Sequence, residues 1–183
     1  MKTLVLLSIL AGAPLAAGAQ PAPSGAPRPA PVIHHAVSTN AAAQAAFDRG
    51  LLDYYAYNPE AAEHEFYTAA DLDPAMAMAY WGIALSNAPN LNVPATDDRQ
   101  EQAQKAIEHA RDLEANASTE DRLFIDAAAA RFDDKTKAAP DALFSNYRDS
   151  LRRIADAYPN DPDATAPLRR SGALRCRWRR HAQ

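Results

Sequence analysis

Cysteine is almost missing from this chain of 183 residues: Cys176 is the only one, so no disulfide can form within the chain. Glycine is scarce as well, with six residues in all, and β-branched residues are sparse. Both scarcities argue against a β-sheet. Much of the 48% hydrophobic content is alanine, which favours closely packed helices. The composition therefore predicts an all-α fold.

The patterns of common active sites are also missing. The sequence has no Gly-rich phosphate loop and no Gly-x-Ser-x-Gly turn. Cys176 stands among arginines in a stretch without helical periodicity. No two histidines are one helical turn apart, as a zinc-binding helix requires. We therefore expect no catalytic residue, no cofactor and no bound metal, and a protein that is not an enzyme.

The first nineteen residues have the pattern of a signal peptide. Lys2 supplies the positive charge, an apolar stretch follows from Leu4 to Leu10, and small residues at 17–19 suit cleavage before Gln20. The apolar stretch is too short to span a bilayer, and no candidate for a membrane span follows it. We expect an exported protein whose mature form starts at or near Gln20.

Residues 20–40 are predicted to be a disordered linker. Five prolines in the first thirteen of these residues favour an extended backbone that joins no core. The linker ends with Ser38, Thr39 and Asn40, and each of these side chains can cap a following helix. A helical domain is predicted over residues 41–166.

Six helices are predicted in that domain from apolar spacing and from start and stop signals. Pro59, the acidic pair at 97–98, Ser118 and Pro140 mark four of the starts. The expected helices cover about 41–57, 59–72 and 75–87, and three more begin near 97, 118 and 140. A seventh is expected near Ala164. The helices would form three hairpins in a row.

Small and aromatic residues in the first two helices follow the spacing of a tetratricopeptide repeat, a helical hairpin of about 34 residues. Counted back from Pro74, the matching residues are Gly50, Ala62, Phe66 and Ala69. The small residues let helices approach closely, and Phe66 fills the remaining gap. Pro74 would end the second helix.

Three stretches together resemble a family of exported bacterial tetratricopeptide-repeat proteins of unassigned function. They are residues 47–51, the run 75–84 that contains Tyr80-Trp81-Gly82, and the loop 89–92. The resemblance spans roughly residues 34–166. It implies a right-handed solenoid of about three antiparallel hairpins in the periplasm of a Gram-negative bacterium, or secreted. It brings no established substrate. We expect a protein or peptide partner, no nucleic acid, and no membrane span after signal cleavage.

The resemblance further implies a binding groove on the first helix of each hairpin. Transferred position by position, the groove comprises Gln44, Phe47, Leu51, Tyr54, Met78, Trp81 and Leu85. Aromatic and methionine side chains are typical of interaction sites. The alternative is that these side chains are buried against the Pro-rich segment or the loop around Asn90. A second function class also remains open, in which His34 and His35, with His64, serve a periplasmic metal-handling or enzyme-accessory protein.

The last stretch, residues 167–183, departs from the rest of the chain. It holds six arginines and no acidic residue, and Pro167 stands where a seventh helix would run. In the family that the chain resembles, a helix commonly continues at this point. We predict that this disordered Arg-rich tail arises from a frameshift in a longer protein; the alternative is a genuine basic tail that binds acidic surfaces.

Overall fold

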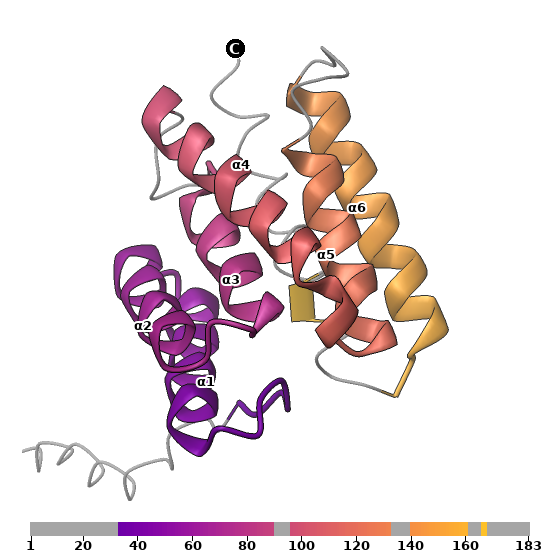
Figure 1. The fold of residues 1–183 in the computed structure, drawn as a ribbon. Coiled ribbons are helices and arrows are strands. Elements are labelled where there is room, and N and C mark those ends of the chain that lie inside the picture. Colours follow the sequence, from indigo (N-terminus) through magenta and orange to yellow (C-terminus); the bar gives the residue numbers. More distant parts are fainter. Residues whose placement is uncertain (1–32, 90–95, 133–139, 161–165, 168–183) are drawn as a thin grey trace, which may run out of the picture. The chain divides into compact units, whose positions relative to one another are not determined.

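The computed structural model describes residues 33–89, 96–132, 140–160 and 166–167 (Figure 1). The chain divides into two compact units, Met1–Ala30 and Pro31–Gln183, and every described residue belongs to the second. Regular structure in the described ranges is entirely helical, which confirms the all-α class for them. The helices are α1 (Ala41–Tyr55), α2 (Pro59–Leu72), α3 (Ala77–Asn87), α4 (Asp97–Asp112), α5 (Thr119–Arg131) and α6 (Pro140–Ala157), with a short 3-10 turn at Glu114–Asn116.

The predictions of a signal peptide and of a tail at 168–183 lie outside the described residues, as does the start of a seventh helix at Ala164. Of the helices in the described ranges, none is both long enough and apolar enough to cross a bilayer.

The helix starts follow the signals in the sequence. Asn40 caps α1, because its Oδ1 accepts the backbone N–H groups of Ala42 and Ala43 at 3.1 and 3.3 Å. Pro59 is the first residue of α2, where its missing N–H costs nothing. Ser118 caps α5 by accepting the N–H of Asp121 at 3.0 Å. Local chemistry therefore fixes where these helices begin.

Two helix boundaries differ from the prediction. The first helix ends at Tyr55 because Tyr57 has a φ of 63°, which is the left-handed region and stops an α-helix. The third helix begins at Ala77 instead of Ala75, since Asp73 holds the preceding residues in a turn: its side chain accepts the N–H of Ala75 and its carbonyl that of Met76. Both turns shorten the predicted helices by two residues.

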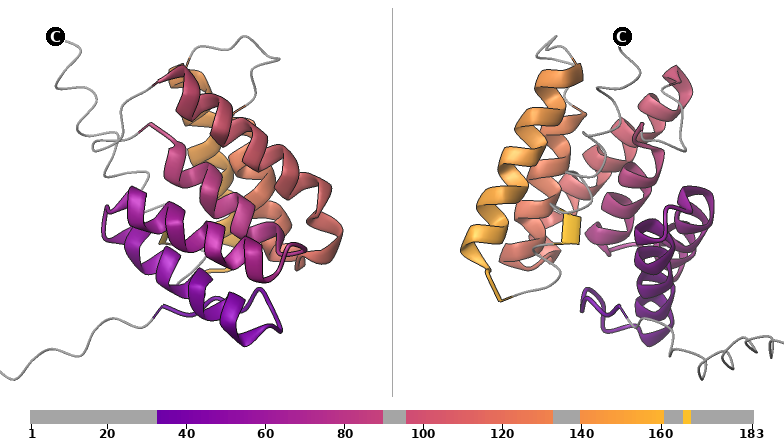
Figure 2. Two further views of the ribbon diagram at one scale, coloured as in Figure 1. Left: turned by 60° about the vertical axis from the view of Figure 1, so that its left-hand side comes forward. Right: turned by 180° about the vertical axis from the view of Figure 1, so that it is seen from behind.

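Consecutive helices pack against each other along the chain. Helix α1 contacts α2, α3 contacts α4, and α5 contacts α6, while α2 contacts α3 and α4 contacts α5. Figures 1 and 2 show these three pairs following one another. The contacts of α1 with α3 and of α3 with α5 place the first helices of successive pairs next to each other.

Phe66 joins the first three helices. It lies on α2, is fully buried, and faces Gly50 of α1 and Gly82 of α3. A Cβ atom on Gly50 would come within 2.7 Å of the Phe66 ring, and one on Gly82 within 2.6 Å. Real Cβ atoms do not approach carbon so closely, so glycine at both positions makes room for the ring.

Three further residues of the repeat pattern, Ala62, Ala69 and Pro74, lie on or just after α2. Ala62 and Ala69 are fully buried on α2. Pro74 is exposed and lies two residues after Leu72, the last residue of α2, directly after the C-cap Asp73.

The domain boundary predicted at residue 40 needs correction, because residues 33–40 are bonded to the helices. Asn40 Nδ2 donates to the carbonyl of Leu72 at 2.9 Å, and Ser38 Oγ donates to Asp73. Val37 and Ser38 donate their backbone N–H groups to Gln44. The polar groups of this segment thus find partners on α1 and at the end of α2. The remainder of the predicted linker, residues 20–32, lies outside the described residues.

Candidate functional site

All seven residues of the predicted groove are buried. Their exposed fractions lie between 0 and 8%, for Phe47, Leu85, Leu51, Met78, Trp81, Tyr54 and Gln44. The sequence had left an open groove and burial as alternatives, and the structure has these side chains buried. Their role in binding a partner stays a prediction.

Four of the seven, namely Phe47, Leu51, Met78 and Trp81, line one small cavity. Its wall is completed by His35, Tyr55, Phe124 and Pro167. The cavity volume is about 10 Å³, close to the lower limit for holding a single water molecule. Gln44, Tyr54 and Leu85 do not belong to this wall. Helices α1, α3 and α5 therefore meet around Trp81, with no space for a further side chain. We call the surface that they form with this cavity the odd-helix face.

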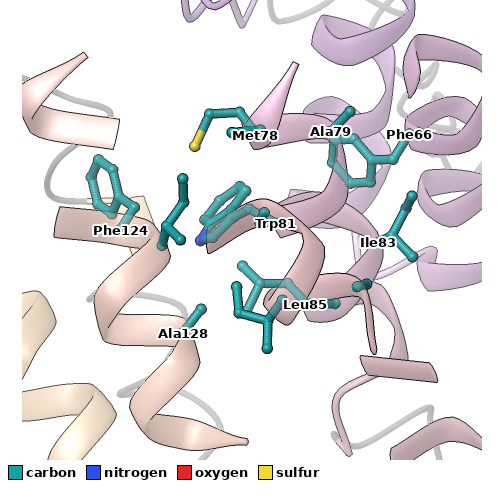
Figure 3. Packing of buried hydrophobic residues seen from close by; sticks show 14 of the residues in the cluster. Phe66, Met78, Ala79, Trp81, Ile83, Leu85, Phe124 and Ala128 are labelled. Carbon is teal, nitrogen blue, oxygen red and sulfur yellow. The ribbon is translucent and has the colours of Figure 1, made fainter. Parts of the chain in front are cut away.

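Trp81 has one polar atom without a visible partner. Its ring lies 6.2 Å from that of Phe124, centroid to centroid, and Met78 lies beside it (Figure 3). The indole Nε1 is buried and makes no hydrogen bond to any residue that the structure describes. A buried donor in this state carries a desolvation cost without compensation.

A non-helical segment, residues 35–38, lies against α1 beside the cavity and is held by Gln44. The side-chain Nε2 donates to the carbonyl of His35 at 2.7 Å. Its Oε1 accepts the N–H groups of Val37 and Ser38 at 2.9 and 3.0 Å. We call residues 35–38 the clasp. One carboxamide thus binds three main-chain groups of the clasp. These hydrogen bonds do not depend on which side chains the clasp carries.

The two adjacent histidines reach different carboxylates. His34 Nδ1 lies 2.7 Å from Asp48 Oδ2, and this imidazole is 60% exposed. His35 Nε2 lies 2.6 Å from Oδ1 of Asp121, whose side chain is buried on α5. Ser118 Oγ donates to the other oxygen of Asp121 at 2.8 Å. The His35 contact therefore joins the clasp to α5 across the cavity.

The metal-site alternative finds no ligand set in the described part of the chain. No group of three or more His, Cys, Asp or Glu side chains there is placed to hold a metal ion. His34 and His35 face separate carboxylates, and His64 is exposed on α2. The three histidines do not form one site.

Sequence reasoning missed several residues around the cavity. His35 had been considered only as a metal ligand, and Phe124 had not been proposed for any site. Pro167 is buried in the cavity wall, although its segment had been assigned to an out-of-frame tail; that origin stays a prediction. Asp121 lies in the first turn of α5. Its bond to His35 had no sequence signal, because 86 positions separate the two.

Comparison of the chain with protein-family models, with curated proteins and with solved structures gives no match. The arrangement of the residues themselves is therefore the basis for a functional proposal.

Proposed function

We propose that this protein is a non-enzymatic interaction scaffold that binds an extended segment of a partner protein on the odd-helix face. The observation that supports this proposal most directly is the clasp. The face already accepts a non-helical main chain, which Gln44 binds through three hydrogen bonds.

The chemistry around Gln44 suits a peptide partner. A carboxamide supplies both a donor and an acceptor, so it can bind main-chain groups of a segment of any sequence. Beside it, Phe47, Met78 and Trp81 are buried around the cavity, so their aromatic and thioether side chains would contact a partner only where its segment replaces the clasp. The main chain would supply affinity, and neighbouring side chains would supply specificity.

The proposal includes a tetratricopeptide-like solenoid as the scaffold. It is supported by successive packed helix pairs and by Phe66, which fills a gap that Gly50 and Gly82 leave open. In stacked hairpins of this kind, the first helices of successive pairs share one face. Export to the cell envelope belongs to the same proposal and rests on the signal-like composition of residues 1–19.

The test is a selection of random peptides against the purified chain, followed by affinity measurements on two variants. Gln44→Leu keeps the side-chain volume and removes the carboxamide that holds the main chain. Gln100→Leu makes the same change at an exposed position of α4. We expect selected peptides to bind the unmodified chain and Gln100→Leu equally, and to bind Gln44→Leu about tenfold more weakly, because hydrogen bonds to the main chain are lost.

Two results would contradict the proposal. Peptides that bind Gln44→Leu as tightly as the unmodified chain would use another surface. A library that yields no peptide of measurable affinity would leave the odd-helix face without a binding activity.

A further inference from the structure

We infer that the clasp is a resident ligand of the odd-helix face, and that the partner which displaces it is a non-helical segment carrying an imidazole or a cationic side chain for Asp121. The inference rests on the proposed function, because the partner and the clasp would use the same face. It adds the chemical class of the partner and a competitor within the chain itself.

The clasp is bound in the way a peptide ligand would be. Gln44 holds its main chain, and the His35 side chain crosses to α5 and bonds Asp121 at 2.6 Å. Its far end is fixed by the bond from Ser38 Oγ to Asp73. These contacts join the clasp to α1, to α5 and to Asp73 at the end of α2. A segment that only capped a helix would not need all three.

Asp121 determines what a competing partner must bring. Its side chain is only 4% exposed, and a buried carboxylate that loses its donor pays a large desolvation cost. Ser118 satisfies one oxygen, and His35 satisfies the other. A partner that removes His35 must therefore donate to Asp121 itself. A positively charged or imidazole side chain fits this carboxylate best.

Trp81 explains how a partner could bind better than the clasp. Its buried Nε1 has no acceptor in the described part of the chain, although Trp81 shares the cavity wall with His35. A partner segment that places a carbonyl or hydroxyl oxygen near this N–H would gain a hydrogen bond that the clasp does not make. The clasp thus supplies hydrogen-bond partners for Gln44 and Asp121 but no acceptor for the Nε1–H group of Trp81.

The test offers the clasp sequence in trans as a labelled peptide, acetyl-Ile-His-His-Ala-Val-Ser-amide, to the full chain. In His35→Ala the resident segment loses its bond to Asp121. We expect the peptide to bind this variant about tenfold more tightly than the unmodified chain, measured by fluorescence anisotropy. His34→Ala is the matched control, because the exposed pair with Asp48 contributes little, and its affinity should equal that of the unmodified chain.

Two altered peptides test whether a side chain that donates to Asp121 determines the affinity. With alanine in place of the second histidine, binding to His35→Ala should fall about tenfold; with lysine there, binding should be retained. Equal binding of the histidine and alanine peptides would overturn the role of Asp121.

A second measurement needs no variant, and so it holds even if His35→Ala folds poorly. Saturating peptide should raise the hydrogen-exchange rate of the chain's own amides at Val37 and Ser38. Unchanged exchange at saturation, or equal peptide affinity for the unmodified chain and His35→Ala, would show that the clasp does not compete. Either result, or no binding at all, overturns this inference, whereas the proposed function is decided separately by the library-selected peptides and their dependence on Gln44.

Discussion

Replacing Phe66 with alanine should lower the free energy of unfolding by about 3–5 kcal/mol, the usual cost of removing a buried aromatic ring. The ring is 0% exposed and fills the space between Gly50 and Gly82, so its loss leaves a cavity where three helices meet. Tyr67→Ala is the matched control: Tyr67 is the next residue and is 46% exposed, so the change should stay within about 0.5 kcal/mol. Chemical denaturation followed by circular dichroism measures both.

A double-mutant cycle identifies the partner of the ring. Gly82→Ala places a Cβ atom 2.6 Å from Phe66, and such overpacking costs about 1–3 kcal/mol, partly offset by the better helix propensity of alanine, about 1 kcal/mol. In the Phe66→Ala background the clash is gone, so the same change should stabilise the protein. If Gly82→Ala has the same effect in both backgrounds, α2 and α3 do not pack through this pair.

Replacing Trp81 with alanine should also cost about 3–5 kcal/mol, equivalent to a fall in melting temperature of about 10–20 °C for a domain of this size. The side chain is 3% exposed and packs against Phe124 of α5. A loss of partner binding in this variant would therefore report unfolding. Binding experiments need substitutions such as Gln44→Leu.

Trp81→Phe separates the ring from its N–H group. Phenylalanine keeps an aromatic contact with Phe124 and removes a donor that has no partner in the described residues. We expect a clearly smaller fall in melting temperature than for Trp81→Ala. Equal losses in the two variants would mean that the indole N–H makes a bond that stabilises the fold.

Much of the helical framework could be predicted from the sequence because local residues determine it. Pro59 and Ser118 act within a turn of their own position, so they mark the starts of α2 and α5 correctly. Both breaks were predicted, but the sequence did not show that the turns at Tyr57 and Asp73 each take up two more residues, since the φ of Tyr57 and the hydrogen bonds of Asp73 have no sequence pattern.

The candidate site was predicted less completely, because its contacts depend on distant parts of the chain. The resemblance to the repeat family placed Phe47, Leu51, Met78 and Trp81 on one face, and these four side chains line one cavity. The sequence could not choose between an exposed and a buried face, since the same apolar residues suit both. The clasp could not be predicted either, because residues 35–38 have no helical pattern. In the sequence Gln44 is an ordinary polar residue, and only the structure shows its hydrogen bonds to the main chain of the clasp.

The most direct test of this account is amide hydrogen exchange at Val37 and Ser38, measured by NMR in the unmodified chain, Gln44→Leu and Gln100→Leu. Both amides donate to Gln44 Oε1, so the account predicts exchange slowed by about tenfold or more relative to a free peptide of the same sequence. The protection should persist in Gln100→Leu and vanish in Gln44→Leu. Exchange as fast as in the free peptide in the unmodified chain, or protection that survives in Gln44→Leu, would contradict the claim that this face holds a non-helical main chain through Gln44.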